Sequence, residues 1–305
     1  MRSQILIGSR GSGLALAQAN EVVKALRELA PHVDYRVVPI KTKGDTRPES
    51  REGTFEGKGV FTKEIDESLL KDEVQVAIHS MKDVTTELPV GLMIAAVPHR
   101  ADHRDALISR SKEKLDRLPG GASIGTSSPR RRTQLLAARS DLQVLDMHGN
   151  IDTRLRKLDS GNYDAIVLAA AGLTRLGLDK RITEFLSTKT MLPAIGQGAI
   201  AIETGEDDPE TQELVSRLDD KSTHRAVEAE RAFAKKLGAN CRTPIAAYAR
   251  VEDGRLAIDG MVSSADGRML LRSQLVSANP EPEKVGEELA ETLLGKGAQL
   301  ILEAA

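Results

Sequence analysis

Apolar residues in the N-terminal third of the chain fall into short continuous runs that alternate with amphipathic segments. The runs at residues 4–8, 35–40, 74–78 and 92–97 predict buried strands. The amphipathic segments at residues 14–29 and 60–70 predict helices. Because continuous apolar strands alternate with helices, we expect a mostly parallel sheet with helices on both faces.

A second α/β unit is expected after a break at residues 98–100. Its strands are predicted at residues 106–109, 123–126, 143–146 and 165–169, and its helices begin near Pro129 and Thr153. A second break at residues 192–198 precedes a further strand-like run, residues 199–204. Two breaks around one α/β unit indicate that the chain leaves a first lobe and later returns to it. This is the connectivity of a hinged, two-lobed clamp.

The last third of the chain has a different pattern. A helix over residues 224–237 precedes three alternating strands, at residues 245–251, 256–262 and 269–276, which are joined by two hairpin turns. A final helix is predicted over residues 282–302, with Gly295 and Gly297 weakening its middle. We therefore predict an α/β protein with three domains. They are a first lobe (1–98 with 199–217), a second lobe (99–198) and an α+β domain with a three-stranded antiparallel sheet (218–305).

Composition narrows the classes of protein to which the chain can belong. A single cysteine among 305 residues excludes an internal disulfide and a thiolate zinc cluster, and the six histidines lack metalloprotease spacing. No run approaches the roughly 18 apolar residues that span a bilayer. The N-terminal segment turns polar too early for a signal peptide. We expect a cytoplasmic protein with no metal and no membrane partner.

Positive charge is concentrated in one stretch of a chain whose formal net charge is −2. Residues 130–181 contain ten Lys and Arg against six Asp and Glu. Aromatic residues make up only 2% of the chain and tryptophan is absent, which argues against a platform for stacking nucleic-acid bases. The pattern favours a site for a small polyanion over one for nucleic acid.

Three polar segments follow predicted strands, where ligands bind in α/β sheets. They are residues 9–13 with Arg10 and Ser12, residues 79–83 with Lys82 and Asp83, and residues 125–132 with Ser128, Arg130 and Arg131. Helix N-termini and arginine side chains both bind anions. Simpler interpretations are a plain turn capped by Ser12, a solvated turn and an exposed basic helix end. Because three adjacent arginines point in different directions around a helix, at most two can contact one ligand.

Cys241 lies in a polar loop, residues 238–244, between a predicted helix and a predicted strand. A lone cysteine is most often a small buried hydrophobe. The polar loop and the neighbouring Arg242, which favours the thiolate, weaken that interpretation. Spacing alone leaves both open. Arg154 and Arg175 follow later strands and could complete a basic cage or be ordinary surface arginines.

Taken together, these segments resemble the porphobilinogen deaminase family, also called hydroxymethylbilane synthases. The resemblance runs in order from Ile7 to about Tyr248. It is carried by SRGSGLALAQ, EGKGVFTKEID, VAIHSMKDV, GTSSPRRRTQL, GNIDTRLRKL, YDAIVLAAAGLTRLGL, LPAIGQGAIAIE and NCRTPIAAYA. The resemblance implies three domains, of which the first two are doubly wound and similar to the lobes of periplasmic binding proteins.

The resemblance implies a transferase of tetrapyrrole biosynthesis. Four molecules of the substrate porphobilinogen are condensed head to tail, with loss of ammonia, into hydroxymethylbilane. The product grows on a dipyrromethane cofactor that is made from the same substrate and held by a thioether, here to Cys241. Each pyrrole ring carries two carboxylates, which arginine forks bind well. The family also suggests a monomer.

The resemblance further assigns roles to single residues. Asp83 matches the catalytic aspartate, whose carboxylate would stabilise the positive charge that forms when ammonia leaves. The positions that match cofactor-binding residues are Ser12, Lys82, Ser128, Arg130, Arg131 and His148. The positions that match substrate-binding residues are Arg10, Lys58, Arg154, Arg175 and Gln197.

His148 is a departure from the family, which typically carries an arginine before Gly149-Asn150. Histidine lacks the bidentate fork of arginine and carries little charge at pH 7. Loss of one charged hydrogen bond costs about 1.5–3 kcal/mol. We therefore expect a weakened site, or one repaired by a neighbouring base.

Two functions of other classes stay open at this point. A non-catalytic anion-binding protein could use the same clamp but would need no thiol at Cys241. A nucleic-acid binder built on residues 130–132 would show strongly salt-dependent binding.

Overall fold

The computed structural model describes residues 2–46, 59–238, 243–278 and 281–303. The chain divides into two compact units, Met1–Ala101 with Ala199–His224 and Asp102–Gly198 with Arg225–Ala305. The three-domain boundaries expected from the sequence stay a prediction. Across the described residues, no helix is long and apolar enough to cross a membrane.

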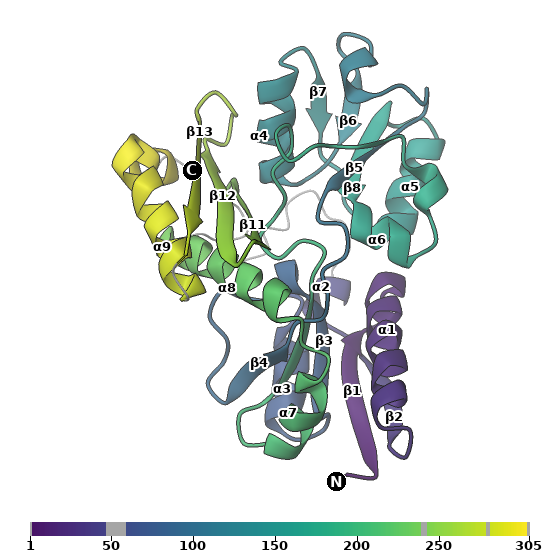
Figure 1. Cartoon of the computed structure of the whole chain (residues 1–305). Helices are drawn as coiled ribbons and strands as arrows, with labels where there is room; N and C mark the ends of the chain where they lie inside the picture. The colour runs from purple at the N-terminus through teal and green to yellow at the C-terminus, as the bar shows by residue number, and fades with distance from the viewer. Residues whose placement is uncertain (1, 47–58, 239–242, 279–280, 304–305) are drawn as a thin grey trace. The chain divides into compact units, whose positions relative to one another are not determined.

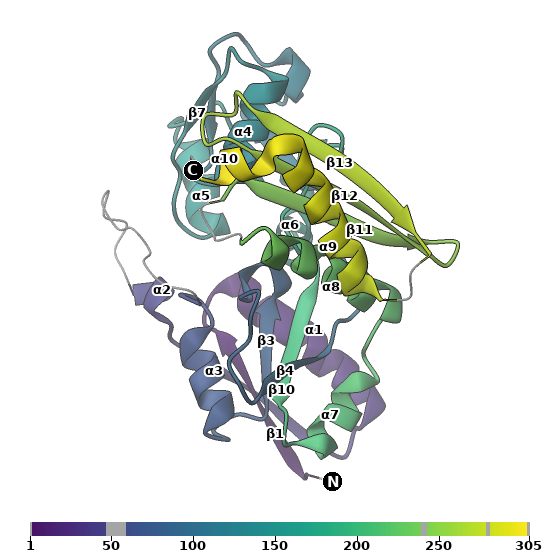
Figure 2. The ribbon, with the colours of Figure 1, turned by 90° about the vertical axis from the view of Figure 1, so that its left-hand side faces the viewer.

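The first unit contains a five-stranded sheet in the order β2-β1-β3-β10-β4 (Figures 1 and 2). The strands are β1 (Gln4–Arg10), β2 (Asp34–Ile40), β3 (Val76–Ser80), β4 (Leu92–Ala96) and β10 (Ile200–Gly205). β1 is parallel to β2 and β3, whereas β10 is antiparallel to both of its neighbours. The expected mostly parallel sheet is confirmed, and the segment after the second break returns to it as β10.

Helices cover both faces of this sheet, as Figure 2 shows. α1 (Gly13–Leu29) and α7 (Pro209–Ser216) pack on one face, where Val22, Leu26 and Val215 join the apolar core. α3 (Lys63–Leu70) packs on the other face through Ile65 and Leu69. α2 (Lys43–Thr46) is a single short turn. The carboxyl end of β1 is followed almost at once by the start of α1.

The second unit contains a sheet of closely similar order, β7-β6-β8-β5-β9. The strands are β5 (Asp105–Ser109), β6 (Ser123–Gly125), β7 (Gln143–Leu145), β8 (Ala165–Ala169) and β9 (Glu184–Phe185). β6 is parallel to β7 and β8, and β5 is the antiparallel strand. α4 (Pro129–Ala138) packs on one face, and α5 (Ile151–Asp159) and α6 (Ala170–Arg175) pack on the other.

A three-stranded antiparallel sheet follows, formed by β11 (Ile245–Glu252), β12 (Arg255–Ser263) and β13 (Leu270–Ser277). α8 (Lys221–Lys236) and α9 (Pro282–Leu293) cover one face of it. The α/β class with a C-terminal antiparallel sheet is thus confirmed. The final helical segment is confirmed together with its weak middle, because a π-helical turn at Leu294–Ala298, in which Gly297 has a φ of 97°, separates α9 from α10 (Gln299–Glu303).

Glu230, on α8, connects the antiparallel sheet to the segment that follows the second α/β sheet. Its side chain is fully buried and accepts hydrogen bonds from Gly196 N at 2.6 Å and Ala249 N at 2.8 Å. Nearby, the rings of His103 and Tyr248 stack with their centroids 3.8 Å apart. These contacts hold the middle of β11 beside segments that flank the second α/β sheet.

Candidate active site

In the first unit, two of the polar segments leave the sheet at the same edge. β1 and β3 are parallel neighbours, with Gly8 paired to Ala77, so their carboxyl ends lie side by side. β1 ends at Arg10, whose guanidinium lies 4.2 Å from the ring centre of Phe61. Ser12 caps α1 and accepts a hydrogen bond from Ala15 N at 3.3 Å.

The segment with the predicted catalytic aspartate differs from its expected structure in one respect. His79 and Ser80 belong to β3 instead of following it, and Met81–Asp83 forms a 3-10 turn at the strand end. Met81 N donates to Ala199 O at 3.0 Å, which ties the turn to the segment before β10. Asp83 is half-buried and Lys82 is exposed. Lys58 lies outside the described residues.

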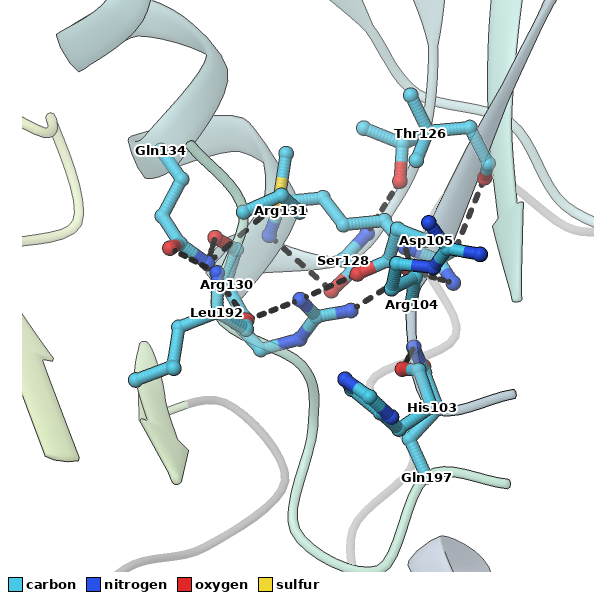
Figure 3. Close-up of polar contacts among 12 residues, drawn as sticks. His103, Arg104, Asp105, Thr126, Ser128, Arg130, Arg131, Gln134, Leu192 and Gln197 are labelled. Atoms are coloured by element: carbon cyan, nitrogen blue, oxygen red, sulfur yellow. Dashed lines mark hydrogen bonds and ion pairs between the residues drawn. The ribbon is translucent and has the colours of Figure 1, made fainter. Parts of the chain in front are cut away.

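In the second unit, the start of α4 gathers the expected cofactor-binding residues. Ser128 is the N-cap and accepts a hydrogen bond from Arg131 N at 3.4 Å. The side chains of Arg130 and Arg131 are only about a twentieth exposed, and both reach Asp105 at the start of β5 (Figure 3). Arg130 donates to the Asp105 carboxylate at 2.8 and 3.2 Å, and Arg131 Nε donates to it at 2.9 Å.

Asp105 is completely buried, and its charge depends on the two arginines. Burial alone would raise the pKa of Asp105, but Arg130 and Arg131 lower it to about 2. Two guanidiniums therefore share one carboxylate, and the cluster keeps a net positive charge at a helix N-terminus. Each guanidinium has five N–H donors. Arg130 and Arg131 use some of these donors in contacts with Asp105, Leu192 O and Val167 O. Among the described residues, the other N–H donors of both guanidiniums have no hydrogen-bond partner and can bind a ligand.

Arg132 points elsewhere, as expected for three adjacent arginines on one helix. It donates to Val144 O at 2.7 Å and pairs with the exposed Asp146 at 2.9 Å. The sequence therefore correctly limited the converging arginines to two. Asp105 itself was missed, because an aspartate at the start of an apolar strand shows no partner in the sequence.

His148 lies in the loop after β7, close to the loop that precedes α4. Its Nε2 is 3.3 Å from Ser127 Oγ, and its side chain is exposed. Ser127 Oγ also donates to Met147 O at 2.9 Å, so the loops after two neighbouring parallel strands are held together. Lys157 Nζ donates to His148 O at 3.0 Å. The basic side chain of Lys157 therefore lies beside the position where the family carries arginine.

The remaining predicted residues hold loops at the same lobe. Arg154 Nε donates to Gly149 O at 2.7 Å, next to the start of α5. Arg175, at the end of α6, donates to Gly198 O at 3.3 Å. Gln197 is 1% exposed and donates to His103 O at 2.8 Å (Figure 3). Cys241 lies outside the described residues.

Both α/β sheets thus present anion-binding groups at the carboxyl ends of their strands. Comparison with known proteins identifies the family. A family model described as "Porphobilinogen deaminase, dipyromethane cofactor binding domain" matches residues 5–213, and one described as "Porphobilinogen deaminase, C-terminal domain" matches residues 224–295. The chain belongs to the porphobilinogen deaminase family. The match extends well past Tyr248, where the motifs recognised in the sequence end.

Full-length relatives support the membership in the porphobilinogen deaminase family. The porphobilinogen deaminase of Carboxydothermus hydrogenoformans is 46% identical over 303 residues, which cover 99% of this chain and 97% of the relative. That of Brevibacillus brevis is 47% identical over 297 residues, covering 97% and 96%. Among solved structures, the sulphonate-binding protein SsuA of Escherichia coli has a TM-score of 0.44 at 12% identity, covering 99% and 89%. That score is too low to add to the assignment.

Proposed function

We propose that this chain is a hydroxymethylbilane synthase that condenses four porphobilinogen molecules, with loss of ammonia, on a dipyrromethane cofactor attached to Cys241. The observation that carries the proposal is the match to a cofactor-binding domain of this family over residues 5–213. The relatives support it as well, because they are named porphobilinogen deaminase and their similarity extends over nearly the whole of this chain.

The described residues fit a cofactor and a substrate that carry several carboxylates. Arg130 and Arg131 share one carboxylate and retain N–H donors, and Ser128 places the N-terminus of α4 beside them. In our proposal Ser12, Lys82 and His148 also contact the cofactor, whereas Arg10, Lys58, Arg154, Arg175 and Gln197 bind substrate. When bound, the cofactor supplies the pyrrole end on which the product grows.

Asp83 is the proposed catalytic residue. It lies on a turn at the carboxyl end of β3. Loss of ammonia from the substrate leaves a positively charged, electron-poor ring. A carboxylate fixed in advance stabilises such charge without reorganisation during the step.

Intact-mass measurement tests the proposed function. The purified chain is expected to exceed its calculated mass by two pyrrole units, and the Cys241→Ser variant is expected to show the bare mass and no turnover. The neighbouring Thr243→Ser variant is a matched control that should keep the added mass. A bare mass for the unaltered chain, unchanged after incubation with porphobilinogen, would indicate a non-catalytic anion binder.

We propose a cytoplasmic monomer with porphobilinogen as its partner and no nucleic-acid ligand. The formal net charge of −2 and the two arginines paired to Asp105 argue against a nucleic-acid ligand, because neither provides a broad basic surface.

His148→Arg is expected to improve the proposed site. Arginine restores a bidentate donor, so we expect kcat/KM to rise by about tenfold, from one added charged hydrogen bond of about 1.5 kcal/mol. Steady-state kinetics and the cofactor-loaded fraction measured by mass would show this. His148→Gln is the control and should bring no gain. An arginine variant without improvement would mean that Lys157 already supplies the missing charge.

A further inference from the structure

Three ionisable side chains that are not among the proposed site residues meet in the core of the first unit. Asp66 on α3, His79 on β3 and Glu203 on β10 are only 7%, 5% and 1% exposed. One side-chain N or O atom from each lies within 4.8 Å of those of the other two. We call these three residues the buried triad.

The strand register explains why the buried triad forms. Antiparallel pairing sets His79 opposite Ala201 and Ala77 opposite Glu203. Because alternate residues share a face, His79 and Glu203 project from the same side of the sheet. α3 packs on this side and contributes Asp66 from its buried surface.

The charges of the buried triad require bound protons. His79 Nε2 lies 3.2 Å from Glu203 Oε2, an ion-pair distance. Within the described part of the chain, Asp66 Oδ1, Glu203 Oε1 and also His79 Nε2 have no partner with hydrogen-bond geometry, so the contact between His79 and Glu203 is an ion-pair distance and not a hydrogen bond. Two ionised carboxylates beside a neutral imidazole would place two negative charges in the core, which burial strongly disfavours. Burial and the charge of Glu203 raise the pKa of Asp66, which favours a neutral carboxyl there.

The buried triad is linked through β3 and β10 to the turn that carries Asp83. His79 is two residues before Met81–Asp83, and Met81 N is bonded to Ala199 O at the start of the same strand pair that His79 and Glu203 bridge. The side chain of Met81 is 1% exposed, so the turn rests on the core. The orientation of the turn therefore depends on how β3 and β10 are joined.

We propose that Asp66, His79 and Glu203 act as positioning residues, sharing two protons in a neutral buried triad that fixes the Met81–Asp83 turn. His79 pairs with Glu203, and Asp66 stays a neutral carboxyl. The consequence for catalysis rests on the proposed function of Asp83. The fixing of the turn by the buried triad does not depend on that function.

Two substitutions separate the members of the buried triad. Glu203→Gln removes the charged partner of His79. We expect kcat to fall by about tenfold, since small displacements of a catalytic group lower rates strongly, while KM changes by less than about twofold. Asp66→Asn replaces one neutral group by another and is expected to keep kcat within about threefold. Intact mass verifies that each variant carries its cofactor.

Amide hydrogen exchange provides a readout that needs no turnover. In Glu203→Gln, exchange of a peptide covering residues 80–84 is expected to accelerate about tenfold, whereas peptides from β1 stay unchanged. Uniform acceleration across the unit would indicate general destabilisation and overturn the proposal. So would equal damage from Asp66→Asn, or an equimolar divalent metal ion in the purified protein.

Carboxyl NMR of the unaltered protein keeps the proposal testable if Glu203→Gln does not fold. The Asp66 carboxyl is expected to be protonated at pH 7, and an ionised Asp66 would contradict the proposal. If the unaltered chain lacks pyrrole units, the proposed function fails, while the exchange and NMR results still decide the positioning role.

Discussion

Asp83→Asn is expected to lower kcat by about 10²–10³, the usual cost of removing one preorganised group that stabilises transition-state charge. Asparagine keeps the size of the side chain but removes the negative charge that the proposed reaction needs. KM should change little, because the arginines and lysines bind the carboxylates of the substrate. Consumption of porphobilinogen over time measures the effect.

Two further variants make the Asp83 result specific. Asp83→Glu keeps the charge but moves it, so an intermediate rate is expected. Glu73→Gln removes a carboxylate from an exposed position in the same unit and should leave the rate unchanged. An Asp83→Asn enzyme that is loaded with cofactor and turns over at a rate within about twofold of the unaltered enzyme would exclude charge stabilisation by this residue.

Asp105→Asn is expected to destabilise the second unit severely. The substitution leaves Arg130 and Arg131 buried without their shared carboxylate, and breaking a buried pair in this way costs about 3–5 kcal/mol. At about 2–4 °C per kcal/mol, the midpoint of thermal unfolding should fall by roughly 6–20 °C. Calorimetry would resolve a change of this size.

Acid dependence provides a second measurement on Asp105. Its pKa in the folded protein, about 2, is below its ordinary value of 3.8. The stabilisation is therefore fully present above pH 4 and is lost as pH falls through 2. The difference in stability between the unaltered chain and Asp105→Asn should accordingly shrink between pH 4 and pH 2.

The neighbouring pair of Arg132 and Asp146 supplies the matched control. Asp146 is 71% exposed, so Asp146→Asn should cost at most about 1 kcal/mol. If both substitutions had equally small effects, Asp105 would not be holding the arginines in the folded protein.

The order of elements was predictable because strands and helices differ in the spacing of their apolar residues. β8 and α1 are examples, since a short apolar run and a long amphipathic stretch leave little ambiguity. Strand pairing was less accessible. The position of β10 between β3 and β4 depends on contacts across more than 100 residues, and local pattern does not specify them.

The candidate site shows the same division. Ser12 and Ser128 were recognisable as helix caps because the capping residue lies within a few positions of its partner. Asp105 and Glu203 were not recognisable, since each acts through residues that are distant in the sequence. The sequence offered one indirect sign: each is an acidic residue in an otherwise apolar strand, where a buried charge needs a partner, but it did not indicate which residue the partner is.

The shared carboxylate of Asp105 has an entropic consequence for the binding of the proposed cofactor. A free arginine side chain gives up as much as about 2 kcal/mol of rotamer entropy when it is immobilised by a ligand. Arg130 and Arg131 are already immobilised when the protein folds. The loss of disorder is therefore incurred when the chain folds, and it does not oppose the binding of the proposed cofactor.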